Sequence, residues 1–433
     1  MTKSDGISRR AFLRRSGARL LGAALVPSMA LGRPLAKEPS PTPGRFTAQA
    51  AIPPKDTAWK SDKKIRIGVV GGGFGSSFYW HEHPDCIVQA VSDLRPDRRG
   101  LLMKTYRCGK AYESLEKLIL DRDIDAVAVF TGAPDHVRHC TAVLKSEKHV
   151  LSAVPAGMSI AECEELVETV KKTGLSYMMA ETSYYHQSVI SARKFLERGD
   201  FGEIFYSEAE YHHPGLEVLY WEKDGTRTWR HGFPPMHYPT HSTAYLVGVT
   251  GERLTEVVCL GWGDDSPILK DNAYQNPFWS ATALFKTDKG HAFRVAVYWK
   301  ASVRGCERGQ WIGTKMSFYD PHPNGLGPVI VRSAAEQEKD DAGFARELPK
   351  LESYVQPQWW QTDMLPEPLR HESGHDGSHT FLTHEFIDAL VHERRPAIDV
   401  YEAVAYTAPG IIAHQSALAG GKQMRIPVFD AKG

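Results

Sequence analysis

The chain has 433 residues, with 52 lysines and arginines against 52 aspartates and glutamates, so its net charge is zero when histidine is neutral. This length suggests two or three domains, and the lack of a basic excess argues against a nucleic-acid-binding protein. Hydrophobic residues make up 42%, which excludes global disorder, and the six cysteines form no CxxC pair, which disfavours a disulfide scaffold or a zinc ribbon.

The first 33 residues have the order of features found in an export signal. A twin arginine followed by Phe-Leu occupies residues 8–14, and a mildly apolar stretch runs from about Leu20 to Ala30. Ser28-Met29-Ala30 offers small residues for cleavage. A basic amphipathic arm is the alternative, but charge, apolar core and cleavage site in this order favour a twin-arginine signal peptide over residues 1–33. We therefore expect a periplasmic or secreted protein that uses the twin-arginine export machinery.

Residues 34–62 are rich in proline and are predicted to form an extended linker. No later segment approaches the roughly 18 uninterrupted apolar residues of a membrane helix, so we expect no membrane anchor. The twin-arginine route carries folded proteins, which is useful when a cofactor must be loaded in the cytoplasm.

A dinucleotide site is predicted at the start of the next domain. Lys64 to Val70 is a β-branched run typical of a buried strand, and it leads directly into Gly71-Gly72-Gly73-Phe74-Gly75-Ser76. Gly71-x-Gly73-x-x-Ser76 matches the dinucleotide fingerprint, with Ser at the third glycine. The first glycine permits a tight turn, and the second lets backbone N–H groups at the start of a helix approach a pyrophosphate.

The residues that follow strengthen this interpretation. Asp93 ends a second predicted strand about 20 residues past the loop, where an acid binds the ribose hydroxyls of NAD. Arg95, Arg98 and Arg99 come next and could bind a 2′-phosphate instead, so NAD is favoured and NADP is the alternative. Strands and helices continue to alternate to about residue 180, which predicts a doubly wound parallel α/β sheet over residues 63–185.

Residues 186–433 have a different pattern. After Gly202 the chain shows alternating β runs at 204–211, 254–261, 281–287 and 291–298, which suit an open, mostly antiparallel sheet. Two late helices are predicted at 379–392 and 400–418. The fold class is therefore an α/β Rossmann domain followed by an α+β substrate domain. Its open sheet could also pair face to face in a homo-oligomer.

Three groups of residues could carry chemistry. Glu181 to Tyr185 follows the last parallel strand, at the edge where such sheets bind ligands. Tyr211-His212-His213 ends a strand of the second sheet, and a functional role and a purely structural one are about equally expected there. His237-Tyr238-Pro239-Thr240-His241 is predicted to be a loop that leads into a helix. A hydride-transfer enzyme needs such a Tyr or His to take the proton of the alcohol.

No metal site is predicted. His371, His375 and His379 are four residues apart, which on a helix would align three metal ligands. Gly374 and Gly377 lie between them and disfavour a helix. We therefore expect residues 372–379 to form a mobile loop that covers the pocket.

The glycine loop, the Asp93 strand, Thr131-Gly132-Ala133-Pro134-Asp135-His136 and the run His149 to Ser159 together resemble the Gfo/Idh/MocA oxidoreductases, over about residues 64–427. The resemblance implies a Rossmann domain joined to an open-sheet domain that covers the nicotinamide and binds a sugar or cyclitol. The cofactor-binding residues that it implies are Gly71, Gly73, Phe74, Gly75, Ser76, Asp93, Thr131, Pro134, His136 and Pro155.

Two family motifs are altered. The family usually has Glu-Lys-Pro where this chain has Ala153-Val154-Pro155, and Asp-x-x-x-His where it has His237-x-x-x-His241. Tyr238-Pro239-Thr240-His241 is instead similar to the NAD-dependent glycoside hydrolases of the α-N-acetylgalactosaminidase type, and Tyr185 matches a tyrosine of theirs. That resemblance implies Tyr185, His237, Tyr238 and His241 as catalytic residues.

The resemblance also implies a redox-neutral cleavage. In such hydrolases oxidation at C3 of the sugar acidifies the C2 hydrogen, the glycosidic bond is eliminated, water adds and the ketone is reduced again. An exported enzyme has little access to fresh nicotinamide, which favours such a cycle with tightly bound cofactor. A conventional periplasmic sugar or inositol dehydrogenase, a sugar–sugar oxidoreductase and a non-catalytic sugar-binding protein are the alternatives.

Overall fold

The computed structural model describes residues 62–302, 306–320, 327–332, 341–343 and 351–429. The predicted signal peptide, and the predicted linker apart from its last residue, lie outside these ranges. Within the described residues, no helix is both long enough and apolar enough to cross a membrane.

The first sheet contains six parallel strands in the order β3-β2-β1-β4-β5-β6. This order is that of a doubly wound dinucleotide-binding sheet and confirms the predicted fold of this domain. The strands are β1 (Ile65–Val70), β2 (Cys86–Ser92), β3 (Ala111–Tyr112), β4 (Ala126–Val129), β5 (His149–Ser152) and β6 (Tyr177–Met179). All four residues of β4 are buried, as expected for a parallel strand covered on both faces.

Four helices connect these strands: α1 (Pro96–Thr105), α2 (Leu115–Leu118), α3 (His136–Lys145) and α4 (Ile160–Thr173). Local sequence fixes the ends of α4, because Ser159 accepts a hydrogen bond from the Glu162 N–H and Gly174 closes the helix at φ +67°. The helix expected after the glycine loop is absent among the described residues. Two 3₁₀ turns, η1 (Phe74–Ser77) and η2 (Trp80–Glu82), link β1 to β2 instead, because only fifteen residues separate the two strands.

The second sheet contains nine strands in the order β14-β13-β12-β11-β7-β10-β9-β8-β15. Among the described strands of this second sheet, only β7 and β10 pair in parallel, so the sheet is mostly antiparallel, as predicted. The strands are β7 (Ile204–His212), β8 (Leu254–Trp262), β9 (Ser280–Thr287), β10 (Ala292–Tyr298), β11 (Cys306–Gly313), β12 (Met316–Tyr319), β13 (Val329–Arg332), β14 (Leu351–Ser353) and β15 (Met424–Arg425).

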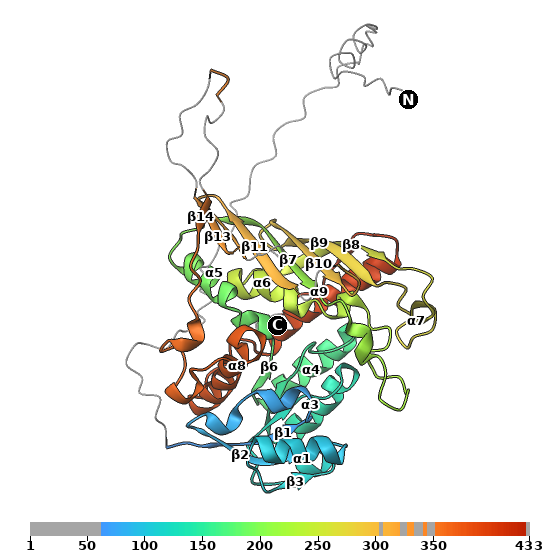
Figure 1. Ribbon diagram of the computed structural model, residues 1–433, viewed down its shortest axis with the longest axis vertical. Helices are drawn as coiled ribbons and strands as arrows, with labels where there is room; N and C mark the ends of the chain where they lie inside the picture. Colours follow the sequence, from blue (N-terminus) through green and yellow to red (C-terminus); the bar gives the residue numbers. More distant parts are fainter. Residues whose placement is uncertain (1–61, 303–305, 321–326, 333–340, 344–350, 430–433) are drawn as a thin grey trace, which may run out of the picture. The chain divides into compact units, whose positions relative to one another are not determined.

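Helices lie against one face of this sheet (Figure 1). The α-helices after β6 are α5 (Gln187–Glu197), α6 (Thr240–Thr250), α7 (Pro267–Lys270), α8 (Gly374–Val391) and α9 (Val400–Leu418). Helix α6 packs on β7 and β11, while α9 packs on β8 and also reaches β6 and α4. The short 3₁₀ turns after β6 are η4 (Thr182–Tyr185), η5 (Leu216–Leu219), η6 (Pro235–His237), η7 (Trp359–Gln361) and η8 (Glu367–Leu369), and one more, η3 (Ala133–Asp135), lies between β4 and α3.

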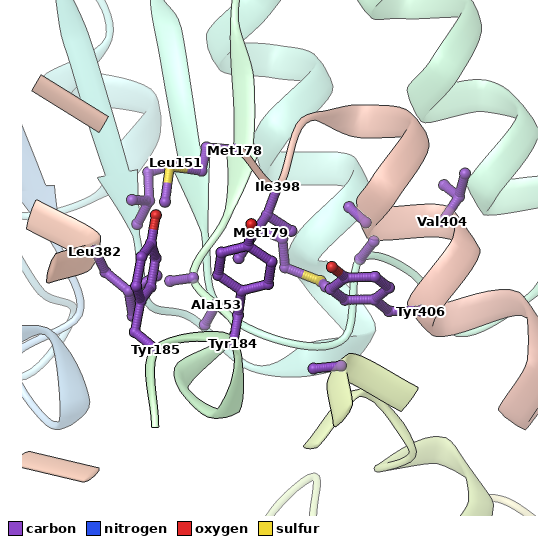
Figure 2. Close-up of a cluster of buried hydrophobic side chains, with 14 of the residues drawn as sticks. Leu151, Ala153, Met178, Met179, Tyr184, Tyr185, Leu382, Ile398, Val404 and Tyr406 are labelled. Carbon is purple, nitrogen blue, oxygen red and sulfur yellow. The ribbon is translucent and has the colours of Figure 1, made fainter. Parts of the chain in front are cut away.

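The hydrophobic core is continuous between the two sheets (Figure 2). Leu151 and Met178 of the first sheet lie beside Tyr184 and Tyr185 of η4, and Tyr406 of α9 completes the cluster. The backbone N–H of Met179 donates to the carbonyl of Ile398, just before α9. The C-terminal helices therefore hold the carboxyl edge of the first sheet against the second domain.

Candidate active site

The glycine loop forms a backbone cradle, and a different structural constraint explains the glycine at each position. Gly71 adopts φ +101°, and a Cβ there would lie 2.3 Å from the Phe130 carbonyl oxygen. A Cβ on Gly72 would lie 2.4 Å from the Arg98 carbonyl oxygen. A Cβ on Gly73 would meet nothing within 4 Å, so this glycine faces open space. That pattern fits a pyrophosphate that approaches the backbone at Gly73.

The other loop residues support the cradle. The Ser76 hydroxyl donates to the Gly73 carbonyl at 2.9 Å, and a Cβ on Gly75 would lie 2.6 Å from the Phe130 ring. Phe74 is partly exposed and its ring contacts Phe78 and Phe130 edge-on, at centroid distances of 5.1 and 5.7 Å.

Asp93 lies one residue beyond β2 and faces the same loop. Its carboxylate accepts from the Gly72 N–H at 2.6 Å and from the Arg95 N–H at 2.8 Å. Arg95 pairs with Asp97 and Glu222, and the Arg99 guanidinium donates to the Asp93 carbonyl oxygen. A carboxylate in this position repels a 2′-phosphate, and two of the three nearby arginines are already engaged, so the geometry favours NAD over NADP.

The loop after β4 is built around two histidines. The ring nitrogens of His136 lie 2.7 Å from the Pro155 carbonyl oxygen and 3.1 Å from that of Thr131, so this buried ring ties two strand ends together. The Thr131 hydroxyl lies 2.9 Å from His139 Nδ1. Pro134 begins the helical turn η3. The cofactor role predicted for His136 is corrected to a positioning role, because both of its nitrogens face backbone carbonyls.

A buried group of polar side chains lies where the two sheets meet. His241 Nδ1 lies 2.9 Å from Glu181 Oε1, and the Ser183 hydroxyl donates to Glu307 Oε2 at 2.7 Å. Glu181 and Ser183 follow β6, His241 is the second residue of α6, and Glu307 is the second residue of β11. We call Glu181, Ser183, Tyr211, Tyr238, His241 and Glu307 the His241 cluster.

Charge sets the protonation state of this cluster. Burial alone would lower the pKa of His241, but the carboxylates of Glu181 and Glu307 raise it to about 10. Burial opposes ionisation of Glu181, yet His241 holds the pKa of that carboxyl below its usual value. The pair is therefore an imidazolium and a carboxylate at neutral pH. Because Nδ1 donates to Glu181, the N–H at Nε2 is the remaining donor of His241.

Aromatic rings line one side of the cluster. The ring of Tyr211 lies 4.8 Å from that of His241, 5.9 Å from that of Tyr238 and 6.0 Å from that of Trp299. Tyr211 faces Glu307 across the β7–β11 ladder. Burial, followed by the charge of Glu307, raises the pKa of Tyr211 well above 10, so its phenol stays neutral and can donate a hydrogen bond.

The two histidines after Tyr211 point to opposite faces of the sheet. His213 lies on the cluster side, with its ring 5.8 Å from that of Tyr211. His212 lies on the other side, 3.5 Å from Glu210. Of this pair, only His213 is placed near the predicted site.

Two predicted catalytic residues lie elsewhere. The ring of Tyr185 stacks on Phe381 at 5.2 Å inside the hydrophobic core (Figure 2). His237 packs 5.1 Å from His414 of α9, and burial, followed by His414, lowers its pKa to about 3. Neither side chain is part of the His241 cluster, so the structure does not bring Tyr185 and His237 together with His241, and the catalytic roles that the resemblance implies for them stay predictions.

Sequence reasoning missed Glu307, and it did not assign a role to Tyr211 or Glu181. Glu307 starts a strand, Cys306–Gly313, that carries charged residues and two glycines and therefore has a weak β pattern. Tyr211 and Glu181 were within the groups singled out, and their positions at strand ends were the available signal.

Comparison with known proteins agrees with this geometry. Residues 65–181 match the family model described as "Oxidoreductase family, NAD-binding Rossmann fold", of the Gfo/Idh/MocA type. Residues 332–433 match the model "Glycosyl hydrolase 109, C-terminal domain". The chain thus joins a Gfo/Idh/MocA Rossmann domain to a glycosyl hydrolase 109 C-terminal domain. The chain is an enzyme of NAD-binding oxidoreductase fold, and NAD is its cofactor.

Relatives of similar length are named glycosyl hydrolase family 109 proteins. A glycosyl hydrolase family 109 protein of Solibacter usitatus is 27% identical over 412 residues, which cover 86% of this chain and 90% of the relative. One of Streptomyces coelicolor is 23% identical and covers 99% of this chain and 95% of the relative.

Solved structures share the fold. Levoglucosan dehydrogenase in complex with NADH has a TM-score of 0.69 at 15% identity and covers 85% of this chain and 100% of its own. The scyllo-inositol dehydrogenase of Lactobacillus casei has a TM-score of 0.59, also at 15% identity, and covers 84% of this chain and 99% of its own. Both show that this chain shares their fold.

Proposed function

We propose that this chain is an exported enzyme that holds NAD tightly and transfers hydride at a secondary alcohol of a sugar or glycoside, within a redox-neutral glycoside cleavage. The observation that carries the proposal is the buried Glu181–His241 pair beside Tyr211 and Tyr238, just past the carboxyl end of β6. Relatives named glycosyl hydrolase family 109, and a neighbour crystallised with NADH and levoglucosan, support a carbohydrate substrate.

NAD, when bound, would supply a hydride acceptor, and Gly73 and Asp93 are the residues that would hold its pyrophosphate and its ribose. His241 supplies a fixed positive charge and an N–H donor at Nε2. As the alcohol oxygen loses its proton, negative charge develops on it, and a buried imidazolium stabilises that charge more than water would. Glu181 keeps His241 charged and fixes which nitrogen faces the pocket.

The neutral phenol of Tyr211 and the half-buried Tyr238 orient sugar hydroxyls, and the ring of Trp299, 5.7 Å from Tyr238, packs behind them. A cationic His241 cannot also accept a proton. Its predicted role in proton transfer is therefore that of a donor.

The residues that follow β5 favour the redox-neutral cycle over a conventional dehydrogenase reaction. Apolar Ala153 and Val154 stand there, so no lysine amine faces the nicotinamide from this position. After oxidation at C3, loss of the C2 proton expels the glycosidic group, water adds, and the ketone regains its hydride.

The decisive experiment uses a candidate glycoside deuterated at C3 and the pure protein with its bound nicotinamide. A transient near-ultraviolet signal of reduced nicotinamide, with no net accumulation and with deuterium returned to C3, supports the cycle. A stoichiometric rise supports the dehydrogenase, and no signal with any sugar supports the binding protein. Full turnover after all nicotinamide has been stripped would contradict the proposal.

Export is the second part of the proposal, and the twin arginine at Arg9-Arg10 supports it. Replacing both arginines by lysine keeps the charge but removes the twin-arginine signal. We expect the natural chain to reach the periplasm of a bacterial host and the Lys-Lys variant to stay in the cytoplasm. Equal periplasmic yields would contradict this part. A homo-oligomer through the open sheet stays a prediction, and sedimentation of the purified protein tests it.

A further inference from the structure

A histidine that the proposed reaction has not yet used lies beside the glycine loop. The ring of His375, at the start of α8, contacts the ring of Phe74 edge-on at 5.5 Å. On its other side, the charges of Glu307, His241 and His186 all act on its pKa, so it stands within electrostatic reach of the His241 cluster. His375 therefore contacts the cofactor loop directly and is influenced by the charges of the His241 cluster, although it comes from the far end of the chain.

The backbone that presents this ring is unusual. His375, Asp376 and Gly377 have φ angles of +52°, +56° and +83°, three left-handed residues in succession, two of which are not glycine. Such conformations are unfavourable for residues with a Cβ and persist where the surroundings hold them. Here Gln187 holds the turn, since its backbone N–H donates to the Asp376 carboxylate at 3.1 Å and its side-chain amide donates to the Asp376 carbonyl at 2.7 Å.

A chain of hydrogen bonds fixes the tautomer of His375. His379 Nδ1 lies 2.8 Å from the Ser77 carbonyl oxygen, which can only accept, so Nδ1 of His379 carries a proton. Burial, followed by His375, lowers the pKa of His379 to about 4, so this ring is neutral and its Nε2 is an acceptor. His375 Nδ1 lies 2.8 Å from that Nε2 and must donate to it. The remaining nitrogen of a neutral His375, Nε2, therefore carries a lone pair.

The site needs such a group. His241 is already protonated, and Tyr211 is a neutral phenol, so neither accepts a proton readily. The His375 ring is open to solvent, unlike the rings of His379 and His241, so a substrate can reach its Nε2.

We propose that His375 is the catalytic base of the oxidation step, with Nε2 taking the proton of the substrate hydroxyl, and that His379 is the positioning residue that aims it. This inference rests on the proposed function. The O–H bond breaks and an N–H bond forms on Nε2, while the carbinol C–H bond breaks and its electron pair leaves with the hydride to oxidised NAD, so that the alcohol becomes a ketone. The new imidazolium is stabilised by Glu307 and by its hydrogen bond to His379.

The first test replaces His375 by Asn, which has no comparable base. The rate of nicotinamide reduction in a single turnover should fall by about 10²- to 10⁴-fold, the usual contribution of general base catalysis, while the affinity for NAD is unchanged. Added imidazole should restore part of the rate in His375→Ala. His371→Asn is the matched control, because His371 bonds to Glu82 outside the site, and it should keep the natural rate. His379→Phe should move the pH dependence of the rate as well as lower it.

A second test does not depend on turnover. Diethyl pyrocarbonate acylates a free imidazole nitrogen, so it should label His375 at Nε2 and spare His379, whose nitrogens are both engaged. NAD together with a candidate sugar should slow the labelling of His375. Failure of the proposed function appears in the natural protein, as bound nicotinamide that no sugar reduces. The inference about His375 is overturned if His375→Asn reduces nicotinamide within about threefold of the natural rate, or if ligands leave the labelling of His375 unchanged.

Discussion

His241 Nδ1 and Glu181 Oε1 lie 2.9 Å apart in a place where the Glu181 side chain is wholly buried and that of His241 is 7% exposed. Two opposite charges in such a setting depend on each other, because removal of one leaves the other buried and unpaired. The pair joins the first domain to the second, since Glu181 follows β6 and His241 belongs to α6. Stability and chemistry are therefore coupled at this contact.

Glu181→Gln should lower both the stability of the fold and the rate of hydride transfer. We expect a loss of about 3–5 kcal/mol in the free energy of unfolding, as found when one partner of a buried ion pair is removed, and a large fall in single-turnover hydride transfer. Denaturant unfolding and nicotinamide absorbance measure the two effects. Glu252→Gln is the matched control, since Glu252 is a buried glutamate paired with His291 at 3.1 Å and takes no part in the His241 cluster. It should lose stability but keep the rate per folded molecule. Equal rates in both variants would refute the role of Glu181.

The same pair predicts how stability depends on pH. His241 has a folded pKa of about 10 against an unfolded value of 6.5, so its contribution is complete below pH 6.5 and is lost as pH rises toward 10. The folded protein keeps a proton that the unfolded chain releases, so the free energy of unfolding should fall by up to about 1.4 kcal/mol per pH unit in this window. Urea titrations from pH 6 to 10 test this, and His241→Gln should flatten the slope. An unchanged slope in that variant would assign the effect to another group.

Substitutions in the glycine loop can separate an effect on NAD binding from an effect on folding. In Gly73→Ala the added Cβ meets no atom, and the methyl should lower NAD affinity by at least about tenfold by keeping the pyrophosphate away. The ψ of −97° at Gly73 lies outside the α and β regions, so the variant should also lose some stability. Gly71→Ala should unfold the loop, since its Cβ would strike the Phe130 carbonyl. Gly100→Ala, also in open space but within α1, should bind NAD normally. Calorimetry with NAD decides the matter, and full affinity in Gly73→Ala would place the pyrophosphate elsewhere.

Asp320 should destabilise the protein at neutral pH. Burial raises its pKa to about 8 from 3.8, so the unfolded chain ionises this group first and stability falls as pH rises between these values. Asp320→Asn imitates the protonated acid and can still accept from the Ser188 hydroxyl, which lies 2.9 Å from the carboxyl oxygen. We expect a gain on the order of 1–2 kcal/mol at pH 8 that shrinks toward pH 4. A constant gain over this range would mean that Asp320 is ionised in the folded protein.

The local sequence pattern was sufficient to predict the fold of the first domain and much of the fold of the second. The β-branched run before Gly71, the spacing to Asp93 and the glycine that ends α4 each have a short-range physical cause, and the structure has all three. The loop at residues 237–241 also leads into a helix as predicted, since α6 begins at Thr240.

The residues that were missed depend on contacts distant in sequence. Glu307 enters the site through the pairing of β11 with β7. His375 was singled out from the sequence, but only as a possible metal ligand, because the left-handed turn that presents it is held by Gln187, nearly 190 residues away. Tyr185 shows the reverse case. A motif match gave it a catalytic role, but packing against Phe381 of α8 turned the ring into the core.

Because Tyr211 pairs with Glu307, the register of β11 against β7 decides whether the site receives a negatively charged side chain. Neighbouring side chains on a strand point to opposite faces, so a slip of β11 by one position would withdraw Glu307 and present Arg308 or Cys306 in its place. Such a change would turn an acid that steadies a cation into a base that repels one. Insertions between β10 and β11 should therefore be tolerated far better when they leave this alignment intact.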